Sequence, residues 1–337
     1  MALSRRFTKD FFNSSCFLYL LMNIAVHIFV PSFDSSLIRL QIPIMKLSAI
    51  LIFLTLSFQS FSQDKPAYKI FASEGKRADY EDIIKASAKS DVVFFGELHD
   101  NPVAHWLELE LTKSLFTARG KELVLAAEMF ETDNQILIDE YFSGIIKETN
   151  FESEARLWKN YATDYKPLLN FAKENGLKFV ASNIPRRYAS VVSSGGFEAL
   201  QKIPSEEFKY IAPLPIEYDP ELACYKDMLS MGGSIGGQMG GKVSENLPKA
   251  QAIKDATMAK SIANNWLKGQ TLIHFNGSYH TDKHLGILWY LNKYNPSIKV
   301  LTITSVLQDD IEKLSDENKG LADYVIVIPS SMTRTYK

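Results

Sequence analysis

Short apolar runs alternate with helical patterns along most of this chain. The first run is Asp91-Val-Val-Phe-Phe-Gly96, and similar runs follow at residues 122–127, 177–181, 271–275, 299–304 and 324–328. An unbroken apolar run bounded by polar residues is typical of a strand buried on both faces, as in a parallel sheet. Helical patterns lie between the runs, at about residues 80–88, 102–120, 133–142, 166–175, 248–268 and 284–294. The alternation predicts an α/β fold with a mostly parallel sheet flanked by helices.

The middle of the chain departs from this alternation. A helical pattern covers about residues 197–210, and the stretch 214–246 contains six glycines between Met231 and Gly241. Glycine loses much backbone entropy on folding, so we expect this stretch to be irregular, as a lid or a binding loop. The segment from about residue 185 to 247 is therefore predicted to form a small helical cap or subdomain, inserted into a single α/β domain of residues 63–337.

The N-terminal residues resemble an export signal. Met45-Lys46 precedes an apolar run of about a dozen residues, and small residues stand at Ser60 and Ser62. We expect translation to start at Met45 and cleavage to follow Ser62, so that residues 1–62 are an extension plus a signal peptide. The alternative is a two-part membrane anchor. Either interpretation predicts an extracytoplasmic protein, in the periplasm or at the cell surface. Peripheral association with the membrane is compatible with both. Only Cys224 follows the cleavage point, which excludes an intrachain disulfide in the mature chain.

The charge balance argues against nucleic acid as a partner. The chain has 37 Lys and Arg against 39 Asp and Glu, a formal net charge of −2. A nucleic-acid-binding surface needs an excess of basic residues. We therefore expect a small-molecule ligand.

Polar residues follow four of the predicted strands directly. Ligands of open α/β sheets bind at the carboxyl ends of the strands. Glutamates placed there are costly to desolvate unless a cation, a proton or hydrogen-bond donors compensate them. The predicted site contains Glu97, His99, Glu128 and His280. These four residues suit either a divalent metal ion or acid–base catalysis. The structural alternative is that His99 caps a loop and that Glu97 pairs with an arginine such as Arg186.

Other residues near these strand ends are more ambiguous. Arg186 and Arg187 open a predicted helix, where they suit an anionic group, but Arg186 would equally well neutralise Glu97 or Glu128. His105 lies either in the pocket or on a helix face. His284 would share a helix face with His280 if both were helical, and an exposed position in the first turn is the simpler interpretation.

Five segments, in order, resemble the ChaN-type haem-binding proteins of the erythromycin esterase and Tiki superfamily. They are Gly96-Glu-Leu-His-Asp-Asn-Pro102, Glu128-Met-Phe-Glu131, Asn183-Ile-Pro-Arg-Arg187, Gln251 to Ala259 and Asn276-Gly-Ser-Tyr-His280. The resemblance implies an α/β domain with a helical subdomain, an extracytoplasmic location, and haem binding tied to iron acquisition, with a homodimer around the ligand as one arrangement. The sequence departs from the family in lacking a lipobox cysteine and in its glycine- and methionine-rich loop.

The resemblance leads to two functional hypotheses. The first is a haem-binding protein of an iron-uptake system, with Tyr188, Tyr279, Arg186 and His105 as candidate haem-binding residues. The second is an exported hydrolase, metal-dependent or acid–base, that uses Glu97, His99, Glu128 and His280. A third interpretation is a binding domain in which the same cluster is a buried salt-bridge network.

Overall fold

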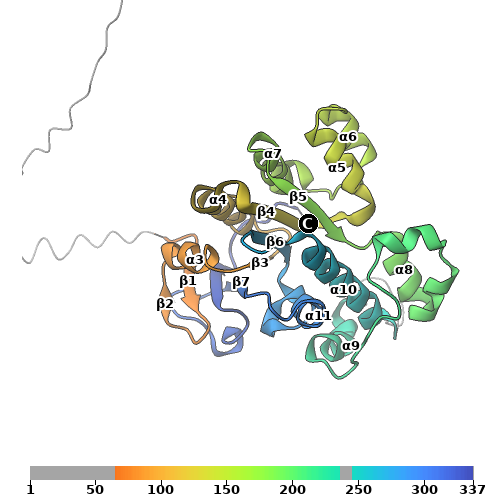
Figure 1. Ribbon diagram of the computed structural model, residues 1–337. Helices are drawn as coiled ribbons and strands as arrows, with labels where there is room; N and C mark the ends of the chain where they lie inside the picture. Colours follow the sequence, from red (N-terminus) through yellow and green to blue (C-terminus); the bar gives the residue numbers. More distant parts are fainter. Residues whose placement is uncertain (1–64, 236–244, 337) are drawn as a thin grey trace, which may run out of the picture. The chain divides into compact units, whose positions relative to one another are not determined.

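The computed structural model describes residues 65–235 and 245–336, and its centre is a sheet of eight strands. Their order is β2-β1-β8-β7-β3-β6-β4-β5 (Figure 1). The six strands from β8 to β5 are parallel, and β1 and β2 extend the sheet antiparallel at one edge. The strand bounds are Lys69–Ala72 (β1), Arg77–Ala78 (β2), Val92–Glu97 (β3), Leu123–Glu131 (β4), Lys178–Asn183 (β5), Thr271–Gly277 (β6), Val300–Gln308 (β7) and Tyr324–Pro329 (β8). The predicted α/β class is confirmed.

Helices cover both faces of the sheet, which explains why its central strands are apolar throughout. In β3, Val93 and Phe95 belong to one buried cluster, while Val92 and Phe94 belong to the other. Side chains alternate between the faces of a strand, so both faces need apolar residues when both are covered. The first face packs against α3 (Tyr80–Ser87), α4 (Pro102–Arg119), α5 (Gln135–Phe142), α6 (Glu148–Glu154) and α7 (Lys166–Glu174). The second packs against α8 (Arg186–Gly195), α9 (Ala223–Ile235), α10 (Leu247–Asn265) and α11 (Ile287–Tyr294).

The turn between β3 and α4 is fixed by local chemistry. Asn101 caps α4, because its side-chain oxygen accepts hydrogen bonds from the backbone N–H groups of Val103 and Ala104. Pro102 occupies the first helical turn, where its missing N–H costs no hydrogen bond. The helix then buries Leu107, Leu111 and Leu115 against the sheet. Residues 98–101 are thereby held at the carboxyl end of β3.

Three local predictions differ from the structure. The stretch 214–246 is not wholly irregular, because α9 extends through Gly232 and Gly233, while residues 236–244 lie outside the described part. The helix predicted from His284 begins only at Ile287, because Lys283 and His284 have positive φ angles of 59° and 58°, which are incompatible with a right-handed helix. Strands β1 and β2 were not predicted, since four and two residues are too few to show a periodic pattern.

The N-terminal predictions concern residues that the structure does not describe. The expected extension and signal peptide, residues 1–62, lie outside the described ranges. Within residues 65–235 and 245–336, no helix combines the length and the apolar character that a membrane span requires.

Candidate functional site

A cavity of about 750 Å³ opens at the carboxyl ends of β3, β4, β5 and β6. It brings together the four residues that were predicted at strand ends, Glu97, His99, Glu128 and His280. The rest of its lining comes from the same strand ends and the turns after them, from α8, α9 and α10, and from the segment after α6, which contributes Trp158: Leu98, Glu131, Trp158, Asn183, Ile184, Arg186, Ala189, Ser190, Ser193, Met228, Leu247, Ala250, Gln251, Lys254, Gly277, Ser278 and Tyr279.

Glu97 and His99 form a hydrogen-bonded pair at the end of β3. His99 Nδ1 lies 2.6 Å from Glu97 Oε1, and the Tyr165 hydroxyl donates to the same oxygen at 2.7 Å. The Glu97 side chain is fully buried, whereas the imidazole of His99 is 36% exposed. Among the described residues, none hydrogen-bonds to His99 Nε2. The carboxylate therefore holds one ring nitrogen, and the other remains open.

The environment shifts the pKa values of this pair in opposite directions. Burial alone would raise the pKa of Glu97, but hydrogen bonds from His105 and His99 and the charge of His105 hold it well below its usual range. Burial would lower the pKa of His99, and the hydrogen bond to Glu97 and the charges of Glu128 and Glu97 outweigh it, so the His99 pKa is raised. Edge-on packing of Trp158 at 4.8 Å between ring centroids further fixes the imidazole.

Glu128 and His280 form a second pair, from β4 and the turn after β6. His280 Nε2 lies 3.1 Å from Glu128 Oε1, and its Nδ1 contacts Asp255 of α10. The register between β4 and β5 shifts between Ala127 and Glu131, and such a bulge redirects side chains near functional sites. Glu128 Oε2 also accepts the backbone N–H of Gly277 at 2.8 Å.

Both ring nitrogens of His280 face carboxylates, so its proton is tightly held. Although burial disfavours the charged ring, the charges of Glu128 and Asp255 raise the pKa of His280 to about 10. Burial likewise opposes ionisation of Glu128, but the charge and hydrogen bond of His280 lower its pKa to about 2. His280 is thus an imidazolium anchor for Glu128, in contrast to the open ring of His99.

Gly277 leaves room between the two pairs. A Cβ at this position would lie 2.7 Å from His99 Nε2 and 3.6 Å from Glu128 Oε2. The first distance is shorter than real Cβ contacts, so any side chain here would displace the imidazole. The glycine in Asn276-Gly-Ser-Tyr-His280 is therefore explained by close approach of the His99 ring.

A second, deeper group of polar side chains lies on the α4 side of Glu97. We call Glu97, His105, Glu108 and Asp164 the buried cluster. His105 Nδ1 lies 3.3 Å from Glu97 Oε2 and 3.2 Å from Glu108 Oε2, and His105 Nε2 lies 3.1 Å from the backbone oxygen of His99. Burial and the charge of Glu97 raise the pKa of Glu108 well above its usual value. Although burial opposes it, hydrogen bonds to Glu108 and Glu97 raise the His105 pKa to about 11.

Among the described residues, two cations line the cavity without a direct ion pair, although the charge of Lys254 helps to lower the pKa of Glu128. Neither Arg186 nor Lys254 lies within ion-pair distance of an Asp or Glu among the described residues, and the two lie on α8 and α10. The alternative that Arg186 neutralises Glu97 or Glu128 is therefore wrong. Its neighbour Arg187 is paired, with Asp133 and with Glu207.

The remaining predicted residues are distributed differently. Tyr279 lines the cavity, but its hydroxyl contacts the backbone oxygen of Cys224. Tyr188 lies outside the cavity lining, because its ring packs in the second apolar cluster and its hydroxyl donates to Glu207 at 2.6 Å. His105 also lies outside the lining, in the buried cluster. His280 and His284 do not share a helix face; His284 is exposed, as the simpler interpretation expected, although it precedes α11, and its Nε2 lies 3.6 Å from Asp323.

Sequence reasoning missed the polar residues that helices contribute to the site. Asp255 holds His280, and Gln251 Nε2 lies 3.1 Å from the same ring. The two are four residues apart on α10, so they share one face with buried apolar residues, and this spacing was the available signal. Glu108 likewise follows His105 by three residues on the buried face of α4.

Comparisons with known proteins agree with this architecture. The chain is similar to the structure described as cofacial heme binding to ChaN of Campylobacter jejuni, with 20% identity and a TM-score of 0.60 over 80% of this chain and 99% of that one. It is less similar to a mutant of the erythromycin esterase EreC in its open conformation, with 9% identity and a TM-score of 0.40 over 71% and 77% of the chains.

One sequence relative and one family also match. Protein RETICULATA-RELATED 5, chloroplastic, of Arabidopsis thaliana is 27% identical over 128 residues, which are 36% of this chain and only 17% of that protein. Residues 83–291 match the family described as haem-binding uptake, Tiki superfamily, ChaN. Since that match spans more than half of the sequence and includes every residue of the two carboxylate–imidazole pairs, the chain belongs to the ChaN family of the Tiki superfamily.

Proposed function

We propose that this protein binds haem in the cavity at the carboxyl ends of β3 to β6, as part of haem or iron acquisition. The observation that carries the proposal is the His99 ring, whose Nδ1 is held by Glu97 and whose Nε2 has no hydrogen-bond partner among the described residues. A neutral imidazole nitrogen is a common axial ligand of haem iron. Histidines that bind metals usually donate their other N–H to a carboxylate or a carbonyl, as His99 does.

The rest of the cavity fits a flat, largely apolar ligand with acidic substituents. Its volume lies in the range of cofactor sites. Apolar side chains contribute Leu98, Trp158, Ile184, Met228 and Leu247 to the walls. The unpaired cations Arg186 and Lys254 suit the two propionate carboxylates of haem, because charge-assisted hydrogen bonds to carboxylates are among the strongest. His99 would bind the haem iron, which is the redox-active metal and the cargo of the proposed uptake role.

A haemin titration of the purified full-length chain tests this function. We expect a Soret shift that saturates at a fixed haem-to-protein ratio and that a protein of similar size without a haem site does not produce. A spectrum that changes linearly with added haemin, as in the control, would contradict the proposal.

The cellular setting and the assembly belong to the same proposal. Family membership and the signal-like sequence before residue 63 support haem capture outside the cytoplasm. Cofacial heme binding, as described for ChaN of Campylobacter jejuni, motivates a haem-dependent homodimer here. Sedimentation velocity with and without haemin tests the dimer: the sedimentation coefficient should rise on haem addition, and an unchanged monomer at saturation would exclude it.

One observation favours a second candidate function, hydrolysis. His99 Nε2 and Glu128 Oε2 both lie close to Gly277, which places an imidazole and a carboxylate near one another, as a base that activates water requires. An esterase and peptidase screen should then detect an activity that His99→Ala abolishes. Absence of activity in the wild-type chain, with and without added divalent metal, would eliminate this candidate.

A further inference from the structure

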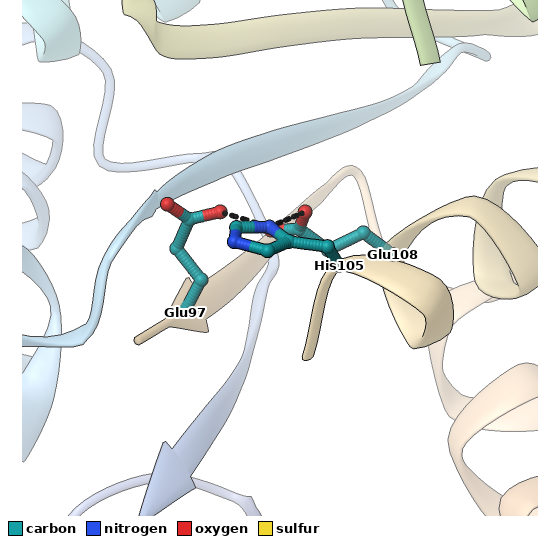
Figure 2. Close-up of side chains that lie close together, drawn as sticks. All are labelled: Glu97, His105 and Glu108. Carbon is teal, nitrogen blue, oxygen red and sulfur yellow. Dashed lines mark hydrogen bonds and ion pairs between the residues drawn. The ribbon is translucent and has the colours of Figure 1, made fainter. Parts of the chain in front are cut away.

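Figure 2 shows the His105 ring between the carboxylates of Glu97 and Glu108, two members of the buried cluster. His105 Nδ1 lies 3.3 Å from Glu97 Oε2 and 3.2 Å from Glu108 Oε2. Charge-assisted N–H···O bonds are normally about 2.7–2.9 Å long. The two separations are longer than such bonds, but they equal the edge of a tetrahedron of ligands about 2.0 Å from a central ion.

Among the described residues, the imidazole of His105 is the one cationic group within the buried cluster. The Glu97, Glu108 and His105 side chains are at most 4% exposed, and Asp164 is equally buried. No lysine or arginine in the described parts of the chain pairs with these three carboxylates. His105 faces all three, and His99 contacts only Glu97 Oε1. Two fully buried oxygens, Glu97 Oε2 and Glu108 Oε1, accept no hydrogen bond of ordinary geometry, and Glu97 Oε2 has only the 3.3 Å contact with His105 Nδ1. Buried carboxylate oxygens are costly to desolvate without a cation or a donor.

The far side of the His105 ring completes the pattern. His105 Nε2 lies 3.1 Å from the His99 backbone oxygen and 3.3 Å from Asp164 Oδ2, and both are acceptors. Nε2 must therefore carry a proton. Nδ1 points between the two glutamates, where its electron pair can bind an ion once the proton on Nδ1 is lost. A metal-bound histidine typically has this arrangement, with its second nitrogen donating to a carbonyl or a carboxylate.

We propose that Glu97, His105 and Glu108 bind one divalent transition-metal ion, of the Zn²⁺ type, at a site that adjoins the haem cavity and shares only Glu97 with its lining. One imidazole and two carboxylates form a donor set that suits such an ion. Binding replaces any proton on Nδ1, which is released to solvent. The ion takes the Oε2 atom of Glu97, while Oε1 keeps its hydrogen bonds with His99 and Tyr165. It thereby fixes the carboxylate that orients His99.

Metal analysis of the full-length, untagged chain tests the site. The protein is stripped with a chelator, loaded with Zn²⁺, passed through a desalting column and analysed for zinc. We expect one equivalent per wild-type chain. Glu108→Gln should weaken Zn²⁺ binding by about 10-fold or more. The matched control is Glu110→Gln on the same helix, because Glu110 is partly exposed and pairs with Lys113 away from the buried cluster, and it should retain the full equivalent.

Two results would overturn the proposal. One is a wild-type chain that keeps no zinc. The other is a zinc content that falls in the His280→Ala variant but stays at one equivalent in Glu108→Gln, because the ion would then lie in the cavity. If Glu108→Gln does not fold, the absorption spectrum of Co²⁺ bound to the wild-type chain tests the site instead. We expect intense d–d bands of a tetrahedral Co²⁺ ion that survive buffer exchange. Weak bands of an octahedral ion that disappear on buffer exchange would refute the site. Haem titrations of the metal-free chain are a separate readout, so either proposal can fail alone.

Discussion

The two cavity histidines differ in what their ring nitrogens contact. His280 is bound on both sides, by Asp255 and Glu128, and its pKa of about 10 keeps it charged. His99 is bound on one side only, by Glu97. An imidazolium with both nitrogens occupied cannot bind iron, whereas a ring with an open nitrogen can. The proposed axial ligand is therefore His99, and the role of His280 is to hold Glu128 in place.

Haem affinity should depend on pH through His99. Iron competes with a proton for Nε2, and carboxylate neighbours raise the His99 pKa above 6.5, its ordinary value. The affinity for ferric haem should therefore be constant above this raised pKa and fall by about tenfold per pH unit below it. Titrations between pH 5.5 and 9, a range of roughly 3.5 units around the ordinary value, measure this. An affinity independent of pH across that range would argue against an imidazole ligand.

Arg186 and Arg187 are adjacent but should differ in their effect on haem binding. Arg186 lines the cavity without an acidic partner, whereas Arg187 is committed to Asp133 and Glu207. Arg186→Gln should weaken haem binding by about 10-fold, the value of one charge-assisted contact, and Arg187→Gln should not. Repeating the titration with the dimethyl ester of haem should remove the difference between wild type and Arg186→Gln. Equal losses in both variants would mean that the propionates bind elsewhere.

At the scale of elements, the positions of the central strands were predictable from the sequence. The exact end of β4 and the conformation of the turn before α11 were not. Apolar runs located β3, β4, β5 and β6, and residues directly after them proved to converge. The length of β4 was underestimated, because a glutamate after an apolar run suggests that the buried strand has ended. Glu128 is compatible with a buried strand only because Gly277 and His280 hydrogen-bond to its carboxylate. The start of α11 was misplaced, because a positive φ at His284 has no sequence signal in a residue other than glycine.

The turn after β6 provides a test of the cavity geometry. Gly277→Ala adds a single methyl group 2.7 Å from His99 Nε2, and the φ of Gly277, −56°, is accessible to alanine. The backbone should therefore tolerate the change while the imidazole moves. We expect a thermal unfolding midpoint close to wild type and haem affinity reduced by at least about 10-fold, as for other disturbed metal ligands. Unchanged affinity would show that the ligand does not require His99 in its present position.

For the whole molecule, the sequence indicated the fold class and the location of the site. It did not indicate the helix residues that hold the site residues in place. The alternation of apolar runs predicts a parallel sheet, and a parallel sheet places strand ends at one edge. Asp255, Glu108 and Asp164 escaped prediction, because contacts between a helix and a distant strand end depend on tertiary packing. Helical spacing places Asp255 on one face with Gln251 and Glu108 on one face with His105, but it does not tell which strand end that face meets.

The paired charges should also shape stability at alkaline pH. The folded-state pKa of His280 is raised from 6.5 to about 10, so its ion pairs contribute fully to stability below pH 6.5. That contribution is lost progressively as the pH rises through about 10, and His105 acts in the same direction. Chelator-treated protein should therefore unfold at lower temperature at pH 9.5 than at pH 7, with a smaller difference in His280→Gln. An identical decrease in both proteins would remove His280 from the explanation.

The most direct test of the account compares the haem complexes of His99→Ala and His284→Ala. Both variants remove one imidazole, but His284 lies beside Asp323, outside the cavity lining. Equilibrium titration with ferric haem should give a dissociation constant at least about 10-fold higher for His99→Ala, with an altered Soret position, and a wild-type value for His284→Ala. A wild-type constant and spectrum for His99→Ala would contradict the account.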